Sequence, residues 1–366
     1  MRKVRMGVIG CGGIVEGAHV HAIQDEMAKG RLEITAVCEI IPERAEKAAK
    51  LWNCDYITDD WTTMLGRVDA ILCALPHDLH HPCGKFFLEN GVHVMMEKPL
   101  ANTEPECIDL IETAERTGKL LMVAYPWRYE DGPKVIRKLL DDKTYGECFQ
   151  VSMWTEQNTH PAEGNWANTK KGLGGGQFFS HGCHYIDLLL WFFGKPKRGI
   201  HFGNNKGTPW MEGEGTSQAM IEFADGTLAY HGGTWGAAGT RLGYSFHFHC
   251  TKGMIEYDHF AGKIYAHTDI ADHIPGEIGA NEKCELIYEH TSGKNVVPEM
   301  NHFLDCVLNG DTPITTAAES LQGLRVIWKM YEAERNNTIA DLTGLGLEDD
   351  WKAVPLTEHG VWEEWE

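Results

Sequence analysis

Short apolar, β-prone runs alternate with amphipathic segments along the first third of the chain. One helical pattern opens at Thr103, with Glu106 at capping-box spacing, and closes on Gly118. Such alternation of strands and helices predicts a parallel sheet whose two faces are both covered by helices. The predicted strands are residues 4–10, 32–38, 68–75, 92–96 and 120–125, and two further helical patterns are residues 42–52 and 82–91.

The pattern changes near residue 126, where longer runs with alternating apolar and polar positions begin. Short turns occur within these runs at Asp225–Gly226 and at Lys252–Gly253. Strands of this kind predict an antiparallel or mixed open sheet. The runs cover residues 147–157, 217–235 and 243–258.

The chain has 366 residues, which is more than one ordinary core requires, so we expect two domains. The first domain covers residues 1–125 and the second covers residues 126–340. Residues 341–366 form an acidic, aromatic-rich tail. We expect this tail either to dock onto a neighbouring subunit or to pack back onto its own chain.

The formal net charge of −20 argues against nucleic acid as a partner, because binding to phosphate backbones needs a basic surface. It also disfavours an anionic membrane surface, and no window offers 18 apolar residues. The eleven cysteines include no C-x-x-C pair, which is typical of reduced thiols rather than a disulfide framework or a zinc site. The first residues resemble a strand more than a secretion signal, so we expect a cytoplasmic protein.

The first predicted strand leads into the glycine-rich turn GCGGIV, which opens at Gly10. Gly10 allows a tight turn, and Gly12 lets the backbone approach a pyrophosphate at the following helix N-terminus. The third position of the dinucleotide-binding pattern is Val15 rather than glycine or alanine, so the motif alone is weak. Glu39 ends the second predicted strand, where a carboxylate can accept hydrogen bonds from an adenosine ribose. It would repel a 2′-phosphate, so NAD is favoured over NADP despite Arg44 nearby; the alternative is an unrelated glycine turn with a surface glutamate.

The fourth predicted strand ends in Glu97, Lys98 and Pro99. Proline restricts the residue before it to extended geometry, so Lys98 is held in one backbone direction. In open α/β sheets, ligands bind beyond the carboxyl ends of the strands, and Lys98 lies at such an end. A lysine–proline pair alone is better explained as a solvated strand end.

Several histidines raise the possibility of a metal site. His77, His80 and His81 follow a strand, but no acidic or cysteine partner has ligand spacing there. Packing or contact with a cofactor is the favoured interpretation. His247 and His249 fall on one face of a strand, where partly exposed sheet histidines are commoner than a metal fragment. We therefore predict no metal.

The segment GLGGGQFFSHGCHYIDLLLWFFGKP places three glycines before an amphipathic helix. Ser180, His184 and Asp187 stand at positions i, i+4 and i+7, which share one face of an α-helix. An imidazole there can accept a proton near neutral pH, with Asp187 or Ser180 to orient it. A packed or surface histidine is about equally plausible. Trp166, just before the glycines, is the best candidate for an aromatic side chain in a ligand-binding cleft, although tryptophan more often packs in a core.

These landmarks together resemble the Gfo/Idh/MocA family (glucose–fructose oxidoreductase, inositol dehydrogenase, rhizopine catabolism). The resemblance extends to about residue 340. Its combination of Glu-Lys-Pro with Gly-Gly…His-x-x-Asp is specific. The supporting segments are GVIGCGGI, MEKPLA, AYPWRY, GGGQFFSHGCHYIDLLLWFFG and NHFLDCVLNGDTPITTAAESLQGLRVIWKMYEAER.

The resemblance implies an α/β protein with an N-terminal Rossmann domain, a doubly wound parallel sheet. A C-terminal α/β domain with a large open mixed or antiparallel sheet follows, and this sheet often makes oligomer contacts. It implies Lys98 and His184 as the catalytic residues: His184 takes a hydroxyl proton as hydride passes to nicotinamide, and Lys98 stabilises the alkoxide. Many relatives carry aspartate where this chain has Ser180, and Pro126 is a smaller departure.

The predicted activity is NAD-dependent hydride transfer from a secondary hydroxyl of a sugar, a glycoside (C3 is a candidate position) or a cyclitol, by a homodimer or homotetramer. One alternative is an NAD-dependent glycosidase that uses transient oxidation. Another is a nucleotide-sensing regulatory protein, which retention of the predicted catalytic pair disfavours. Predicted cofactor-binding residues are Gly10, Gly12, Gly13, Ile14, Glu39, Arg44, Leu75, His77, His80, Glu97 and Lys98, and predicted substrate-binding residues are Lys98, Arg128, Trp166, Ser180, His181 and His184.

Overall fold

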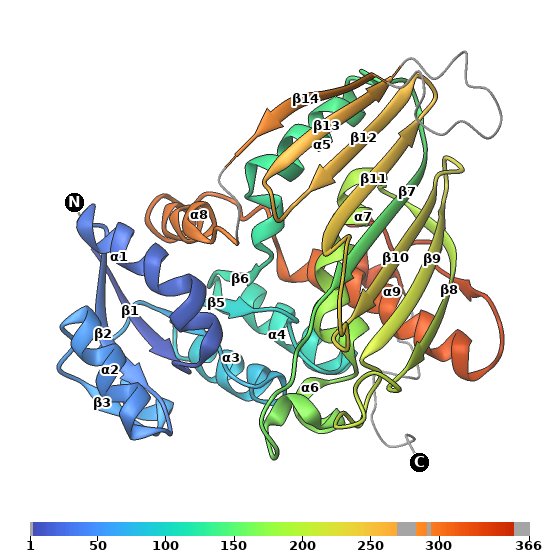
Figure 1. Cartoon of the computed structure of the whole chain (residues 1–366). Helices are drawn as coiled ribbons and strands as arrows, with labels where there is room; N and C mark the ends of the chain where they lie inside the picture. Colours follow the sequence, from blue (N-terminus) through green and yellow to red (C-terminus); the bar gives the residue numbers. More distant parts are fainter. Residues whose placement is uncertain (1–2, 269–282, 291–293, 355–366) are drawn as a thin grey trace.

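The first of two sheets has six parallel strands in the order β3-β2-β1-β4-β5-β6, which confirms the predicted doubly wound arrangement (Figure 1). The structure is a computed structural model, and it describes residues 3–268, 283–290 and 294–354. The short strand β3 was not predicted. The strands are β1 (Val4–Ile9), β2 (Leu32–Cys38), β3 (Ile57–Thr58), β4 (Ala70–Cys73), β5 (His93–Glu97) and β6 (Leu121–Ala124).

Helices cover both faces of this sheet. Buried side chains of α1 and α2 share a core with Met6 and Val8, and those of α3 and α4 share a second core with Ile71 and Val94. The predicted capping box opens α4: the Thr103 hydroxyl accepts a hydrogen bond from the Glu106 backbone N–H. The helices are α1 (Val20–Ala28), α2 (Pro42–Trp52), α3 (His80–Glu89) and α4 (Glu104–Thr117).

The second sheet has nine strands in the order β14-β13-β12-β11-β7-β10-β9-β8-β15. It is mixed, because β10 pairs parallel with β7 whereas its other pairs are antiparallel. Both predicted turns join strands, and Gly226 has the positive φ (94°) that favours glycine. The strands are β7 (Cys148–Glu156), β8 (Pro196–Asn204), β9 (Thr216–Phe223), β10 (Leu228–Thr234), β11 (Tyr244–Cys250), β12 (Gly253–Asp258), β13 (Lys263–Thr268), β14 (Lys283–Glu289) and β15 (Ala340–Asp341).

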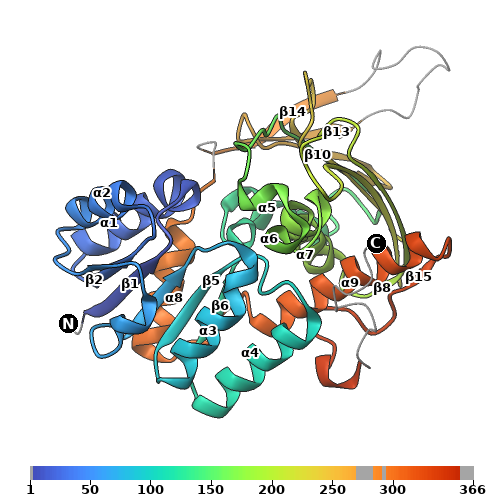
Figure 2. The same ribbon diagram turned by 90° about the horizontal axis from the view of Figure 1, so that it is seen from below.

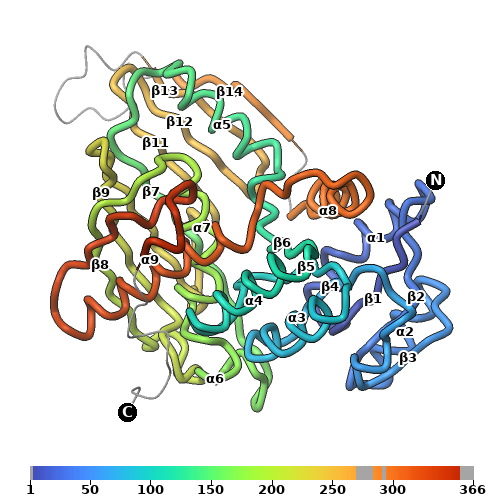
Figure 3. The backbone as a smooth tube through the Cα atoms, turned by 180° about the vertical axis from the view of Figure 1, so that it is seen from behind, coloured from blue at the N-terminus to red at the C-terminus, as the bar shows by residue number. Residues whose placement is uncertain are grey.

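Helices α7 and α9 lie on the same face of the second sheet (Figure 2). In contrast, α8 returns to the first sheet and packs on α1 (Figures 1 and 3). Its Met300, Phe303 and Leu304 are fully buried in the core that contains Met6 and Val8. The two sheets therefore do not divide the chain at one point. The remaining helices are α5 (Asp131–Asp141), α6 (Lys170–Leu173), α7 (Cys183–Phe193), α8 (Val297–Asn309) and α9 (Ala317–Arg335).

The described part of the predicted tail packs back onto α9. The guanidinium of Arg325 donates to the Trp351 carbonyl oxygen at 2.7 Å, and Gln322 donates to the Gly344 and Gly346 carbonyls. Residues 355–366 of this tail lie outside the described residues. Among the helices that the structure describes, none has the length and apolar character needed to span a membrane.

Candidate active site

A cavity of about 1240 Å³ lies at the carboxyl ends of the first sheet's strands, between that sheet and the second. The loops after β1, β2, β4 and β5 form one wall. The opposite wall comes from α7 and the residues before it, from β11, and from loop residues such as Trp166 and Lys294. The location is the one where open α/β sheets bind ligands.

The glycine turn has the geometry of a phosphate cradle. Gly10 has a φ of 81°, and a Cβ there would lie 2.3 Å from the Ala74 carbonyl oxygen, so only glycine fits. Gly12 and Gly13 line the cavity, and a Cβ on Gly13 would meet nothing within 4 Å. Val15, at the third position of the motif, is buried in the core and causes no obstruction. The backbone here is open to a pyrophosphate at the helix N-terminus.

Glu39 is fixed at the end of β2 by two backbone groups. Its carboxylate accepts hydrogen bonds from the N–H of Cys11 at 2.8 Å and from the N–H of Ile41 at 3.0 Å. The side chain lines the cavity, as does that of Arg44. Each carboxylate oxygen keeps a free lone pair for a ribose hydroxyl, so these residues fit an NAD adenosine.

Lys98 lies at the end of β5 and reaches across the cavity. Its ammonium donates to the Ser180 carbonyl oxygen at 2.9 Å, and burial lowers its pKa. The neighbouring Glu97 is buried and bonded to His19 Nε2 at 2.7 Å. Burial alone would raise the pKa of Glu97, but the charge of Lys294 and the bond from His19 hold that pKa well below its usual range. An ionised carboxylate therefore lies directly behind Lys98.

His184 lies in the first turn of α7 and lines the same cavity. Neither of its ring nitrogens has a hydrogen-bond partner among the described residues, and Nδ1 is buried. Burial, together with the positive charges of Lys98 and Lys294, lowers its pKa well below 6.5. The imidazole is therefore neutral at neutral pH and able to accept a proton.

The other predicted site residues around His184 also reach the cavity, although they are engaged in different ways. Ser180 lines it with its side chain while its carbonyl holds Lys98. Both ring nitrogens of His181 are engaged, by the side chains of Gln177 and Tyr244. Trp166 is 37% exposed and also lines the cavity. Ile14, Leu75 and His77 line the cavity as well, and the His77 ring meets that of Trp166 edge-on.

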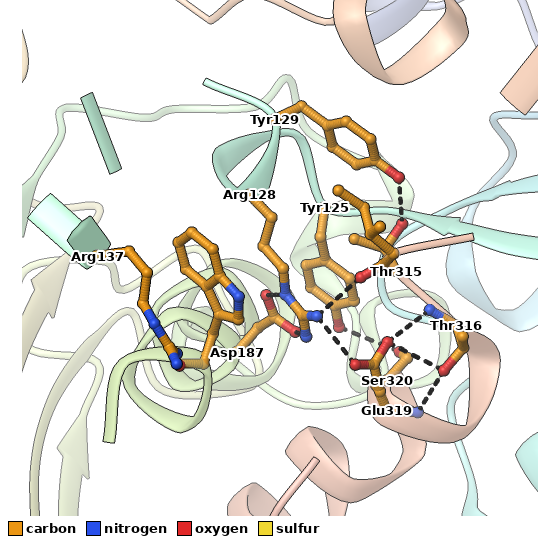
Figure 4. A network of polar contacts seen from close by, with 11 residues as sticks. Tyr125, Arg128, Tyr129, Arg137, Asp187, Thr315, Thr316, Glu319 and Ser320 are labelled. Atoms are coloured by element: carbon orange, nitrogen blue, oxygen red, sulfur yellow. Dashed lines mark hydrogen bonds and ion pairs between the residues drawn. The ribbon is translucent and has the colours of Figure 1, made fainter. Parts of the chain in front are cut away.

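Two predictions, about Asp187 in α7 and about Arg128, are wrong. Asp187 does not orient His184; it forms a buried ion pair with Arg128 (Figure 4). Arg128 is buried and does not line the cavity. Its donors are bonded to Asp187, the Ile314 carbonyl and Glu319. The residues from Phe178 to Gly182 form a π-helical turn, so α-helical spacing does not place Ser180 and Asp187 on one face.

The prediction that His80 binds cofactor is also wrong. Its ring is fully buried, with Nδ1 bonded to the Pro99 carbonyl at 2.8 Å and Nε2 to the Leu75 carbonyl at 3.0 Å. It ties together the loops after β4 and β5 instead. His81 pairs with Asp109, away from the cavity. Over the residues that the structure describes, no three histidine, cysteine, aspartate or glutamate side chains are placed to hold a metal ion.

Sequence reasoning missed several residues of the cavity, and Tyr244 and Lys294 are two of them. Tyr244 begins β11, and its position in an apolar–polar strand pattern does not mark it as facing a ligand. Lys294 precedes α8 and is almost 200 residues from Lys98 in the chain. Only the three-dimensional return of α8 to the first sheet brings Lys294 to the cavity.

Comparison with known proteins agrees with this geometry. The model of the Gfo/Idh/MocA oxidoreductase family with an NAD-binding Rossmann fold matches residues 4–125, and that of the Gfo/Idh/MocA C-terminal domain matches residues 134–256. Together the two matches cover well over half of the chain.

Individual relatives are distant. D-glucoside 3-dehydrogenase of Escherichia coli (strain K12) is 26% identical over 196 residues, 53% of this chain and about half (55%) of that protein. 2,7-anhydro-N-acetylneuraminate hydratase of Mediterraneibacter gnavus is 25% identical over 268 residues, 70% of this chain and 68% of that protein. A structure of levoglucosan dehydrogenase, in complex with NADH and levoglucosan, shares the fold with a TM-score of 0.80 at 18% identity, over 93% of this chain and 100% of that one. Because these two family models match most of the chain, the protein belongs to the Gfo/Idh/MocA oxidoreductase family and carries its NAD-binding Rossmann fold.

Proposed function

We propose that the protein is an NAD-dependent dehydrogenase acting on a secondary hydroxyl of a sugar, glycoside or cyclitol. The observation that carries this proposal is the neutral His184, whose buried Nδ1 has no hydrogen-bond partner among the described residues, in the same cavity as Lys98 and the glycine turn. Oxidation of an alcohol is assisted by a base that takes the hydroxyl proton and by a cation that stabilises the alkoxide.

Bound NAD would supply the hydride acceptor. A ring nitrogen of His184 takes the proton of the substrate hydroxyl. The ammonium of Lys98 uses one N–H to hold the Ser180 carbonyl, and its other two hydrogens are available to stabilise the developing alkoxide. Ionised Glu97 favours the charged form of Lys98, against the effect of burial.

The test is absorbance of the reduced nicotinamide at 340 nm while sugars, glycosides and cyclitols are offered with NAD. Lys98→Met and His184→Asn should each lower kcat by about 10²–10⁴, the contribution of a positioned acid–base group. Lys206→Met and His21→Asn change exposed residues outside the cavity and are the matched controls. Absence of turnover with the whole panel, despite NAD binding, would refute the dehydrogenase proposal.

Oxidation at C3 of a glucoside is the finer proposal, and its support is the likeness to D-glucoside 3-dehydrogenase. Carbon-13 NMR of the product locates the new carbonyl carbon. A ketone at another position would overturn this assignment and leave the dehydrogenase proposal intact.

A redox-neutral reaction is a second candidate, because the relative named a hydratase aligns over more of this chain than the glucoside dehydrogenase does. An enzyme of this kind, including a glycosidase that oxidises its substrate transiently, consumes substrate without accumulating NADH. Measuring substrate loss and absorbance at 340 nm in the same sample separates the two candidates.

We also propose a homodimer or homotetramer. Exposed apolar side chains on strands of the second sheet support it, among them Phe202, Met220 and Leu228. Light scattering after size-exclusion chromatography gives the mass directly, and a monomer at micromolar concentration would contradict it.

A further inference from the structure

A line of hydrogen bonds leads from the interior of the second sheet to the cavity. Ser217 Oγ donates to Gln177 Oε1 at 2.9 Å, and Gln177 Nε2 lies 3.3 Å from His181 Nδ1. His181 Nε2 in turn lies 3.1 Å from the Tyr244 hydroxyl. Ser217 and Gln177 are fully buried, whereas His181 and Tyr244 line the cavity. Both ring nitrogens of His181 are thus bonded to protein groups, and Tyr244 is the last polar group of this line, at the cavity.

The amide of Gln177 sets the direction of this line. Its oxygen is occupied by Ser217, so its nitrogen, which can only donate, faces His181 Nδ1. The amide is also confined sterically, since a Cβ on Gly233 would lie 2.4 Å from Gln177 Nε2. Nδ1 of His181 is therefore the acceptor in this bond.

His181 is neutral, because burial and the charge of Lys98 lower its pKa well below 6.5. A neutral ring that accepts at Nδ1 carries its hydrogen on Nε2 and donates it to the Tyr244 oxygen. Burial raises the pKa of Tyr244, so the phenol keeps its own hydrogen. The Tyr244 oxygen accepts from His181, and the Tyr185 hydroxyl interacts with it as a second donor, so the hydrogen of Tyr244 is left available to a ligand in the cavity.

We propose that Tyr244 donates a hydrogen bond to a substrate oxygen beside the reacting carbon, and that Gln177 and His181 are positioning residues for that donor. The proposal rests on the dehydrogenase function given above. The Tyr244 hydroxyl lies 3.1 Å from His181 Nε2, and the ring of His181 lies 6.0 Å from that of His184, so the donor and the base face the same cavity. His184 accepts the proton of one hydroxyl while Tyr244 offers a proton to its neighbour, which distinguishes the two oxygens. The substrate class is accordingly a sugar or cyclitol with an acceptor oxygen vicinal to the oxidised carbon.

The first test removes the donor. Tyr244→Phe should raise KM for the best substrate by about 3- to 10-fold, the loss of one neutral hydrogen bond, with kcat changed less. The vicinal deoxy analogue should bind equally to the wild type and to Tyr244→Phe. Tyr265→Phe, which removes a hydroxyl from a partly exposed residue on β13 outside the cavity, is the control.

The second test reverses the donor's direction. Gln177→Glu keeps the shape of the side chain, but the carboxylate only accepts hydrogen bonds. A neutral His181 must then carry its hydrogen on Nδ1, and its Nε2 becomes an acceptor for the Tyr244 hydroxyl. At low pH the doubly protonated His181 of this variant still donates to Tyr244, so KM should be close to that of the wild type. As pH rises and His181 becomes neutral, KM should rise to the Tyr244→Phe value, whereas the wild-type KM shows no such step. Gln150→Glu, on the exposed part of β7, is the isosteric control. The charged or titratable groups around His181 are Lys98, Lys294, His184, His231, Tyr185 and Tyr244.

The double variant completes the cycle. Gln177→Glu combined with Tyr244→Phe should be no worse than Tyr244→Phe alone, because Gln177 acts only through the phenol. A wild-type KM in Tyr244→Phe, or a pH-independent, wild-type KM in Gln177→Glu, would overturn the inference while wild-type turnover upholds the dehydrogenase. Binding of the substrate to the NADH complex, measured by calorimetry, should show the same losses without turnover.

Discussion

Replacing Arg128 by methionine tests whether the buried ion pair under α7 stabilises the second domain. Arg128 and Asp187 are each about 3% exposed, and Nε of Arg128 donates to Asp187 at 2.8 Å. Methionine leaves the carboxylate buried without a cation, which costs about 3–5 kcal/mol in similar cases. Loss of the bond to the Ile314 carbonyl adds about 1 kcal/mol. The contact with Glu319, which is more exposed, adds little.

The assay is urea unfolding, monitored by tryptophan fluorescence and by circular dichroism. The shift in midpoint gives the change in the free energy of unfolding relative to the wild type. Arg198→Met removes an exposed ion pair with Glu222 and should cost less than about 1 kcal/mol. The decisive comparison is Asp187→Asn: it should destabilise the wild type but stabilise Arg128→Met, since it removes the uncompensated charge. Destabilisation in both backgrounds would refute the reasoning.

Three further predictions concern the cofactor side and the response to pH. Glu39→Gln should weaken NAD binding by about 10-fold or more, the loss of charge-assisted hydrogen bonds to ribose, while NADP binding changes less; NADH fluorescence titration measures both. Gly10→Ala should lower the melting temperature and abolish NAD binding because its Cβ meets the Ala74 carbonyl, whereas Gly13→Ala has open space and should melt like the wild type. Burial raises the pKa of Glu130 to about 7, so the folded state holds a proton that the unfolded state loses near pH 4.5. Stability should therefore fall by roughly 3 kcal/mol as pH rises from about 4.5 to 7, and Glu130→Gln should remove this slope in urea titrations.

Local patterns predicted the parts of the fold that depend on local physics. Apolar runs located the central strands, Thr103 and Gly118 marked the ends of α4, and Asp225–Gly226 marked a hairpin. Lys98 and His184 were singled out because proline and a glycine-rich entry make their surroundings unusual.

The errors arose where spacing was extrapolated or where distant segments meet. The i, i+7 relation of Ser180 and Asp187 assumes α-helical geometry, and a π-helical turn breaks it. Burial of Arg128 depends on α9, which lies far along the chain, so no local signal marks it as a structural cation. Tyr244 and Lys294 reach the cavity for the same kind of reason.

The position of α8 has a consequence for how the protein is made. The ribosome completes the six strands of the first sheet about 180 residues before it reaches Phe303 and Leu304. Until then the apolar side of α1 that these residues cover is exposed to water or to chaperones. A fragment that stops at residue 125 would carry the whole nucleotide-binding turn and still lack part of its core. The first sheet therefore completes its core only after α8 has been synthesised, although its strands are finished much earlier.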